Sequence, residues 1–169
     1  MIAPAHWAGA AAVDGAKGQR DEALSLDRQI CFPLYAASRL LTRVYQPILG
    51  PLGITYPQYI VLLVLWEVAP CTVSQVGERV VLNTNTITPL LKRLEQHGLV
   101  ERLRRTTDER VVEVHLTAAG LGLKAHCNCF PSRLLESTQF PLEKAAALKQ
   151  LLDELVLTLR SGSENQTVT

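Results

Sequence analysis

The chain has 169 residues, 47% of them hydrophobic and 20% charged, which is typical of a single folded domain with a sizeable core. Its formal net charge of +1 excludes a strongly basic nucleic-acid-binding protein, and no run reaches the ~20 apolar residues of a membrane-spanning helix. Four cysteines without a Cys-x-x-Cys pair and an N-terminus without the features of a signal peptide favour a cytoplasmic protein with reduced thiols.

The first predicted element is a long helix over about 26–50, preceded by a small-residue-rich segment, 1–20, that we expect to be a flexible tail. Pro33 interrupts the helical pattern. The helix therefore either begins near Gln29, with the proline in its first turn, or begins earlier and kinks. The apolar stripe of this helix faces either a partner chain or the domain core, and it consists of Ile30, Leu34, Ala37, Leu41, Val44 and Ile48.

Two helices joined by a tight turn are predicted in the middle of the chain. A nearly all-apolar helix over Tyr56–Glu67 precedes them and is expected to be buried. The first helix of the pair covers Thr72–Val81, and the second extends from an N-cap at or near Asn85 to a stop at Gly98. The polar turn Asn83–Asn85 joins them as a helix-turn-helix requires.

The second helix of the pair has side chains that suit a DNA major groove. Short polar groups in its first turn would reach base edges, and a basic pair further along would reach phosphate. Pro89 is expected near the helix start, where its missing N–H has no intrahelical partner. An ordinary surface helix is the alternative for this stretch alone. The candidate DNA-binding residues are Asn83, Thr84, Asn85, Thr86, Thr88, Lys92 and Arg93.

Two strands are predicted after these helices. The runs Leu99–Arg105 and Arg110–Leu116 flank a turn at Thr106–Glu109. In the second run, apolar residues alternate with Glu113 and His115, which is typical of a half-buried strand. A helix-turn-helix followed by such a hairpin constitutes a winged helix.

The remainder of the chain is predicted to be helical. A helix from Ala118 to about Phe130 is broken or bent by Pro131. The last helix, Leu142–Arg160, is lined with leucine, a pattern typical of a dimerisation arm, and a polar tail is expected over 161–169. The predicted fold class is therefore mainly α with a small β-hairpin wing (α+β).

Cys31 and the pair Cys127 and Cys129 are candidates for thiol chemistry. If the first helix begins just before Cys31, free N–H groups and the helix dipole favour a thiolate there; a packed, unreactive thiol is the alternative. Cys127 and Cys129 differ by ~200° of rotation on a continuous helix, so they do not bind one metal together. Cys127 continues an apolar stripe with Leu123 and Phe130. No catalytic, metal or cofactor motif is recognisable, and Cys71, expected in a loop, has no assigned role.

Four stretches carry a family resemblance: LDRQICFPLY at 26–35, ITYPQYIVLLVLWE at 54–67, LNTNTITPLLKRLEQHGLVERLR at 82–104 and DERVVEVHLTAAG at 108–120. Together they resemble the MarR family of winged-helix regulators, and specifically its organic-hydroperoxide-sensing (OhrR) branch. The resemblance covers roughly Leu26 to Arg160. It implies one MarR-type domain over 21–160, with a winged helix at about 54–117 and dimerisation helices at about 26–50 and 118–160.

The same resemblance implies roles for individual residues. First and last helices would interlock into a homodimer whose winged helices straddle successive major grooves of a pseudo-palindromic operator. Cys31 would be the peroxide-reactive thiol, Tyr45 and Tyr56 would hydrogen-bond it, and Tyr35 would lie nearby. In the wing, Asp108 would hold Arg110 for entry into the minor groove, with Arg105 as a further DNA-binding candidate.

Two features depart from the family pattern. Asn83-Thr84-Asn85 replaces an Asp-Ser-Gly-like triplet, which should alter or relax base readout. The resolving cysteine of two-cysteine members follows the proline matched by Pro131, near Glu136, whereas Cys127 and Cys129 come some two turns earlier. Of these two, Cys127 is favoured as the resolving thiol, on the expectation that its stripe packs on the first helix of the partner chain. Capping of Cys31 by a small cellular thiol is the alternative.

The predicted function is that of a non-enzymatic, dimeric repressor that releases DNA when organic hydroperoxide oxidises Cys31. One alternative is a regulator that responds to another oxidant such as hypochlorite. Another binds a small phenolic or metal ligand without thiol chemistry. A thiol peroxidase that turns over is the alternative from a different class of protein.

Overall fold

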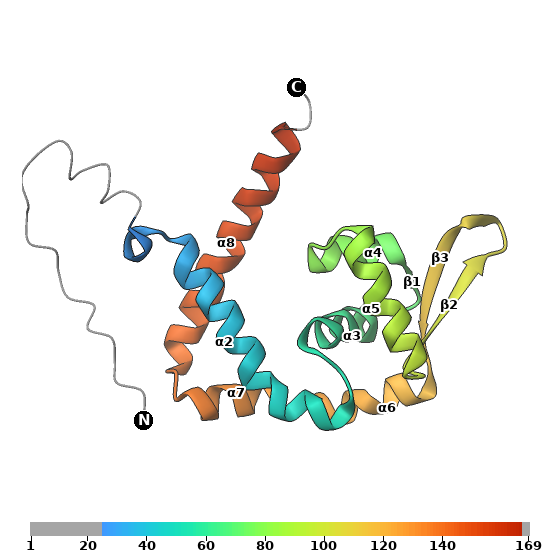
Figure 1. The fold of residues 1–169 in the computed structure, drawn as a ribbon, viewed down its shortest axis with the longest axis horizontal. Coiled ribbons are helices and arrows are strands. Elements are labelled where there is room, and N and C mark those ends of the chain that lie inside the picture. The colour runs from blue at the N-terminus through green and yellow to red at the C-terminus, as the bar shows by residue number, and fades with distance from the viewer. Residues whose placement is uncertain (1–24, 167–169) are drawn as a thin grey trace, which may run out of the picture. The chain divides into compact units, whose positions relative to one another are not determined.

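The computed structural model describes residues 25–166, without the side chains of 131, 133–135 and 163–166 (Figure 1). The predicted tail 1–20 lies outside these residues. The chain divides into two compact units, with the boundary between Arg43 and Val44, and each unit is described by itself. The predicted extent of a single domain over 21–160 stays a prediction.

The described part of the first unit consists of the short 3-10 helix η1, Leu26–Arg28, and the beginning of α2, Cys31–Leu49. The N–H of Phe32 donates to the carbonyl of Gln29 at 3.1 Å, and Pro33 lies in the first turn of α2. This confirms a helix that begins close to Gln29, since a proline at this position removes no intrahelical hydrogen bond. Ile30 and Leu34, from the predicted apolar stripe, are exposed within the unit.

The second unit begins with the end of α2 and is centred on the buried helix α3, Tyr56–Val68. The 3-10 helix η2, Gly50–Leu52, and the left-handed Gly53, with φ of 69°, separate the two helices. The side chain of Gln58 accepts the N–H of Thr55 at 2.8 Å, which satisfies an otherwise unpaired donor at the start of α3. The predicted buried helix is confirmed.

The helix-turn-helix is formed by α4, Val73–Val80, and α5, Thr84–Gln96. The turn that follows α4 packs closely on Gly77 of that helix, where a Cβ atom would lie 2.7 Å from the carbonyl oxygen of Leu82. The N-cap of α5 is Asn83, two residues before the predicted position. The expectation that Pro89 lies near the helix start is wrong. The proline lies in the second turn, where the hydrogen bond to the carbonyl of Asn85 is lost.

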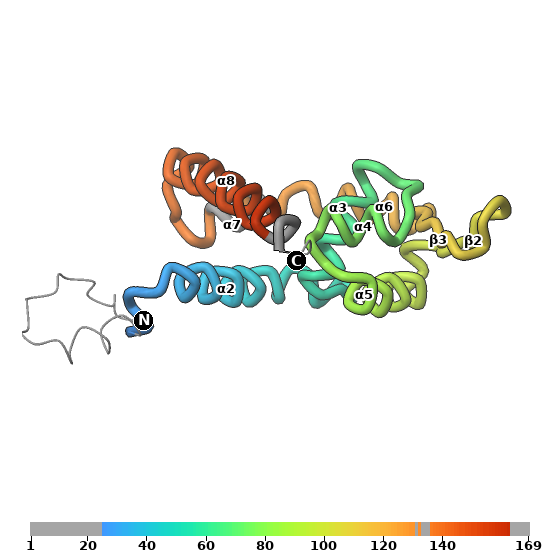
Figure 2. The backbone as a smooth tube through the Cα atoms, turned by 90° about the horizontal axis from the view of Figure 1, so that it is seen from above, coloured from blue at the N-terminus to red at the C-terminus, as the bar shows by residue number. Residues whose placement is uncertain are grey.

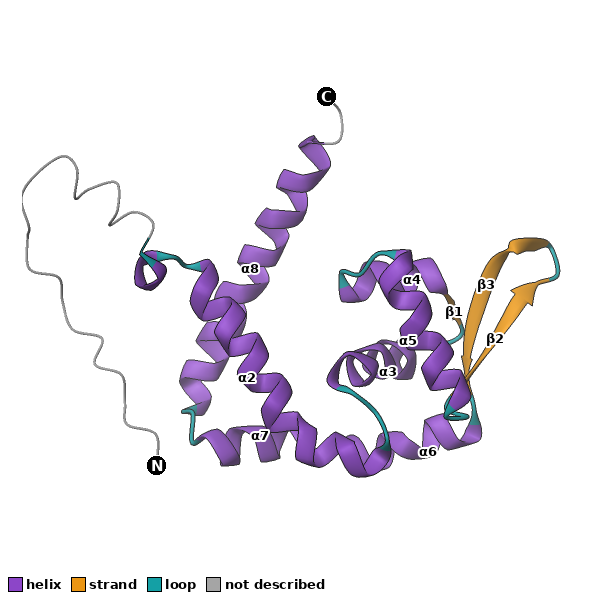
Figure 3. Cartoon of the chain, in the orientation of Figure 1, coloured by secondary structure: helices purple, strands orange, loops and turns teal. Residues whose placement is uncertain are grey.

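The hairpin belongs to a three-stranded antiparallel sheet with the order β1-β3-β2 (Figure 3). Its strands are β1, Cys71–Thr72, β2, Val100–Arg105, and β3, Asp108–Leu116. The predicted turn Thr106–Glu109 is too long, because Arg105 already pairs with Asp108 and only Thr106 and Thr107 remain in the turn. A register shift between Arg104 and Arg105 accommodates the extra residues of β3. Strand β1 was not predicted, since two residues are too few to show alternation. In both views the hairpin projects beyond the helix-turn-helix (Figures 1 and 2).

The C-terminal helices differ from the prediction in their boundaries. Helix α6, Ala118–Cys127, ends before the predicted Phe130, and α7, Phe130–Thr138, begins there. Pro131 lies in the first turn of α7, where its missing N–H has no intrahelical partner. Helix α8 covers Leu142–Gln166, so it continues past the predicted end at Arg160 into the segment that was expected to be a tail.

The core of the second unit forms around α3, with buried side chains from α4, α5, the sheet and α6. The indole Nε1 of Trp66 donates to the carbonyl of Gly120 at 2.9 Å and joins α3 to α6. The leucine-lined helix α8 contributes little to this core, because Leu148, Leu151 and Leu159 are exposed.

Within residues 25–166, no single helix is long and apolar enough to cross a membrane. Among the same residues, the consecutive segments Cys31–Leu52 and Tyr56–Val68 are together long and apolar enough to do so, but a bend separates them.

Candidate nucleic-acid interface and thiol sites

The start of α5 is held by a local pair of side chains. The Oδ1 atom of Asn83 accepts two hydrogen bonds from Thr86, one from its N–H and one from its hydroxyl, both at 3.0 Å. This cap satisfies a backbone donor that has no partner within the helix. Two of the five polar candidates in this stretch are therefore bound to each other.

The outer face of α5 carries exposed polar and basic groups. Ile87, Leu91 and Leu94 are fully buried against the core. At about 100° per residue, Asn85 and Lys92 lie on the opposite side of the helix, and both are exposed. Arg93 and Gln96 are exposed beside them. The sequence interpretation missed Gln96, although its spacing from Lys92 and Asn85 indicates this face.

Arg110 lies near the tip of the hairpin. The side chain of Arg110 is 92% exposed. Asp108 Oδ1 accepts the backbone N–H of Arg110 at 3.1 Å and its Nε–H at 3.2 Å. These hydrogen bonds hold the pKa of the Asp108 carboxyl below its usual range. Asp108 thus positions Arg110, as the resemblance implied, while leaving most of the guanidinium in solvent.

Arg105 differs from Arg110 because a carboxylate of its own chain neutralises it. Its Nε and one terminal nitrogen donate to Glu113 Oε1 at 2.9 and 2.6 Å, and this pairing lowers the pKa of Glu113. His115 Nε2 lies 3.5 Å from the other carboxylate oxygen of Glu113. A contact of Arg105 with DNA would compete with this ion pair.

An ion pair between α5 and the hairpin was not predicted. Arg102 on β2 donates its backbone N–H to Glu95 Oε1 at 3.0 Å and two guanidinium N–H groups to Oε2 at 3.0 and 2.7 Å. The partners are seven residues apart, on different elements, so no helical or strand spacing could reveal them. The link fixes the end of α5 against the strand that leads to the wing tip.

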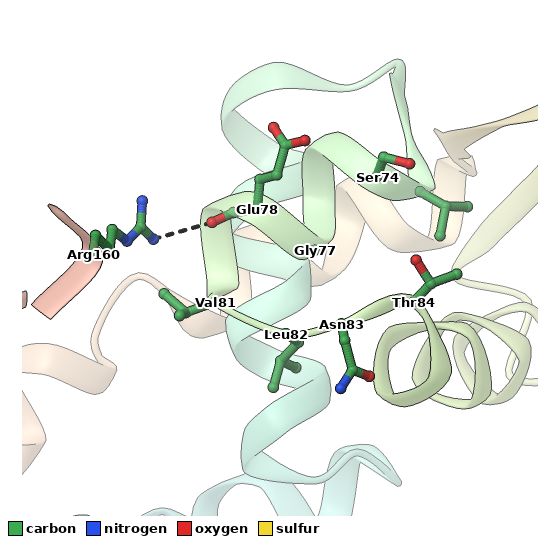
Figure 4. Close-up of a pocket in the computed structure, with 9 residues that line it drawn as sticks. Ser74, Gly77, Glu78, Val81, Leu82, Asn83, Thr84 and Arg160 are labelled. Carbon is green, nitrogen blue, oxygen red and sulfur yellow. Dashed lines mark hydrogen bonds between the residues drawn. The ribbon is translucent and has the colours of Figure 1, made fainter. Parts of the chain in front are cut away.

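The end of α8 reaches the helix-turn-helix (Figure 4). The guanidinium of Arg160 donates to the backbone carbonyl of Glu78, near the end of α4, at 3.0 Å. Figure 4 also shows the side chain of Thr84 directed towards α4 and that of Asn83 directed away from it. Both residues belong to the wall of the pocket that Arg160 borders.

Tyr45 and Tyr56, the phenols predicted to support a reactive thiol, lie side by side with ring centroids 4.9 Å apart. Tyr59 completes the cluster at 5.6 Å from Tyr45 and was missed as a site candidate, although the stretch Thr-Tyr-Pro-Gln-Tyr contains it. Burial raises the pKa of all three phenols, that of Tyr59 to about 12, so they are protonated donors at neutral pH. Tyr35 belongs to the first unit, where it is exposed.

The four cysteines occupy different environments. Cys31 is exposed at the first residue of α2, and Cys129 is exposed at the N-cap of α7. Cys71 is buried in β1, opposite Val114, so the expectation that it lies in a loop is wrong. Within residues 25–166, no group of three or more His, Cys, Asp and Glu side chains is placed to hold a metal ion.

Cys127 is the thiol for which the structure differs most from the prediction. Its side chain is 3% exposed and packs with Phe130 in the core of its own chain, with Leu123 against it. The expectation that this stripe packs on a partner chain is therefore wrong, because α3 and its aromatic side chains already cover it. Burial, and secondly the neighbouring Cys129, raise the pKa of the Cys127 thiol to about 11.

Comparison with known proteins identifies the family. The family of transcriptional regulators SarA and Rot matches residues 43–126. The chain is 44% identical over 149 residues to the HTH-type transcriptional regulator TtmR of Methylorubrum extorquens (strain PA1), covering 85% of this chain and 75% of that protein. It is also 44% identical over 136 residues to the organic hydroperoxide resistance transcriptional regulator of Bacillus subtilis (strain 168), covering 80% of this chain and 92% of that one. This chain belongs to the MarR-type winged-helix transcriptional regulators.

Solved structures of other MarR-type regulators share the fold. One of them is AbfR of Staphylococcus epidermidis. Its reduced, DNA-bound structure matches with a TM-score of 0.67 and 36% identity over 83% of this chain and 98% of that one. Overoxidised AbfR bound to DNA matches with a TM-score of 0.68 and 38% identity over 84% and 98%. The predicted mainly helical winged fold and the resemblance to the OhrR-like branch are confirmed.

Proposed function

We propose that this MarR-type regulator is a homodimeric repressor that releases a pseudo-palindromic operator when organic hydroperoxide oxidises Cys31. The observation that carries the proposal is the exposed Cys31 at the first residue of α2, in a chain that also presents a winged helix. Its exposure at the start of the helix leaves this thiol accessible to a peroxide. The similarity to the organic hydroperoxide resistance regulator of Bacillus subtilis supports the choice of oxidant.

DNA binding is assigned to α5 and the wing of each protomer. The outer face of α5, with Asn85, Lys92 and Arg93, would enter the major groove, and Arg110 would enter the adjacent minor groove. The pair Glu95–Arg102 holds these two elements in a fixed mutual arrangement before DNA is met. AbfR, a structural neighbour, binds DNA in its solved complexes.

Two copies of this surface are needed for a pseudo-palindromic operator, with half-sites about one helical turn apart. The exposed leucines of α8 and the exposed Ile30 and Leu34 on either side of the start of α2 are the surfaces that a second copy would cover. A dimer with two-fold symmetry would present one copy of this surface to each half-site. The protein would act in the cytoplasm, where free thiols are kept reduced.

The sensing step is a two-electron oxidation. The thiolate of Cys31 attacks one peroxide oxygen, an S–O bond forms and the O–O bond breaks, and the alkoxide leaves as an alcohol after it takes up a proton. Cys31 becomes a sulfenic acid and the peroxide is reduced. Cys31 and Tyr45 of one chain lie about 21 Å apart along α2, so we assign the donor role to Tyr45 and Tyr56 of the other protomer, whose raised pKa values keep them protonated. The protein is thus a switch that is oxidised once, and not an enzyme.

The test is DNA binding of the reduced protein to its own upstream region, measured by fluorescence anisotropy with and without cumene hydroperoxide. The wild type should bind and be released on oxidation, whereas Cys31→Ser should bind equally well and stay bound. Cys129→Ser removes the other exposed thiol and should still release DNA, because the sulfenic acid forms on Cys31 without a second thiol. Release of Cys31→Ser at the wild-type peroxide concentration would show that Cys31 is not the sensor. Peroxide-insensitive DNA binding by the wild type would favour the ligand-responsive alternative.

A further inference from the structure

We infer that Asn85 is the side chain of α5 that selects a base, an adenine in each half-site, and that Asn83 and Thr86 only position the helix start. The inference rests on the proposed DNA-binding function. It assigns different roles to polar residues that the sequence alone does not distinguish: Asn83, Thr84, Asn85, Thr86 and Thr88.

Asn83 is unavailable for adenine because its acceptor is already used. An amide side chain recognises adenine with two atoms: its oxygen accepts from the N6 amino group and its nitrogen donates to N7. Both hydrogen bonds that the Oδ1 atom of Asn83 can accept come from Thr86, from its N–H and its hydroxyl. The same contacts commit the hydroxyl of Thr86.

Thr84 and Thr88 are excluded by direction and by chemistry. The side chain of Thr84 is directed towards α4, on the wall of the pocket beside the helix-turn-helix (Figure 4). Thr88 is half-buried, and one hydroxyl cannot form the two-atom contact that distinguishes adenine.

Asn85 meets all the requirements. It is the second residue of α5 and is exposed, and no hydrogen bond of its side chain is found within the described residues. At about 100° per residue it lies some 200° from the buried Ile87 and ~180° from the buried Leu94, so its amide points away from the core. Lys92, seven residues on, lies about 20° from it around the helix. The base-reading amide and a phosphate-binding ammonium would thus lie on one face, as a helix in the major groove requires.

The experiment measures binding of the reduced, full-length protein to a set of operators in which every half-site position carries each of the four base pairs. The wild type should prefer an A·T pair at one position of each half-site by about 10- to 100-fold. Asn85→Ala should lose that preference, keep the preferences at all other positions and keep the slope of affinity against salt concentration. Asn85→Asp, which lacks the donor for N7, should lose it too.

Thr84→Ala is the matched control on the neighbouring residue and should leave every base preference in place. The melting temperature of Asn85→Ala should not fall, because the residue is exposed and alanine favours the helix. An unchanged preference in Asn85→Ala would overturn the inference, and so would an equal loss of affinity for all operators, which indicates a phosphate contact. A wild type without any base preference would instead contradict the proposed function.

Discussion

Glu95 on α5 accepts three hydrogen bonds from Arg102 on β2, at 3.0, 3.0 and 2.7 Å. The pair connects the helix proposed for the major groove with the strand that leads to Arg110. The side-chain hydrogen bond from Arg102 contributes most to the lowered pKa of Glu95. Because both side chains are only partly exposed, solvent weakens this ion pair less than a fully exposed one.

Glu95→Gln should therefore destabilise the protein at neutral pH by about 1 kcal/mol, since glutamine keeps an acceptor but loses the charge. The folded protein lowers the pKa of Glu95, so this contribution is present above its ordinary value of 4.5 and is lost as pH falls through the lowered pKa. The gap in melting temperature between wild type and Glu95→Gln should narrow as pH falls below 4.5 and close once the pH is below the lowered pKa of Glu95. Glu101→Gln, an exposed neighbour on β2, is the control and should show little difference at either pH. A gap that stays constant with pH would contradict an ionic origin.

Arg110 and the pair Lys92 and Arg93 should contribute to DNA binding in different ways. Arg110→Ala should weaken binding to the operator by about 10- to 100-fold more than binding to unrelated DNA, because a narrow minor groove concentrates negative potential. Lys92→Ala and Arg93→Ala should lower affinity for all sequences and reduce the salt slope by about one unit for each phosphate that is no longer neutralised. Anisotropy titrations at several salt concentrations measure both effects. Equal operator binding by wild type and Arg110→Ala would show that the wing does not enter the groove.

The four thiols should react with iodoacetamide in two groups. Cys31 and Cys129 are exposed and should be alkylated first, whereas Cys71 and Cys127 are buried and should react only on unfolding. At a pKa of about 11, only about one in a thousand Cys127 side chains is a thiolate at pH 8. Mass spectrometry of peptides from the native, time-sampled reaction gives the order. Early modification of Cys127 would show that this part of the core opens.

The same burial changes the expectation for the step after oxidation of Cys31. A sulfenic acid condenses with a second thiol to form a disulfide and water. Since Cys127 is enclosed in its own core, a covalent dimer formed with peroxide should be lost in Cys129→Ser and retained in Cys127→Ser on non-reducing gels. Loss in Cys127→Ser alone would restore the resolving role predicted from sequence. No covalent dimer with Cys31 oxidised would favour capping by a small thiol.

Gly120 should tolerate no side chain. A Cβ atom there would lie 2.0 Å from the carbonyl oxygen of Leu99, and the Gly120 carbonyl accepts the Trp66 indole. Gly120→Ala should destabilise the protein by about 3 kcal/mol, since backbone must move. Gly122→Ala, two residues along α6 with open space around it, should be neutral or stabilise by up to about 1 kcal/mol. Urea unfolding measures both, and similar free energies of unfolding for the two variants would contradict the close packing.

Much of the fold was predictable because it depends on local patterns. Apolar spacing and capping residues indicated the helices α3, α4 and α5, and alternation indicated the hairpin. Helix starts were the less certain feature. Asn83 and Asn85 have the same side chain, and only the hydrogen bonds from Thr86 show that Asn83 is the cap.

The sequence by itself determined the family, the winged fold and the residue types available for DNA and peroxide, since these follow from motifs and periodicity. Only the tertiary structure decided how those residues are used. It separated buried Cys127 from exposed Cys129, paired Arg105 with Glu113 while leaving Arg110 in solvent, and joined Glu95 to Arg102. The physical reason is that burial and ion pairing depend on neighbours from other elements, which spacing along one helix or strand does not specify.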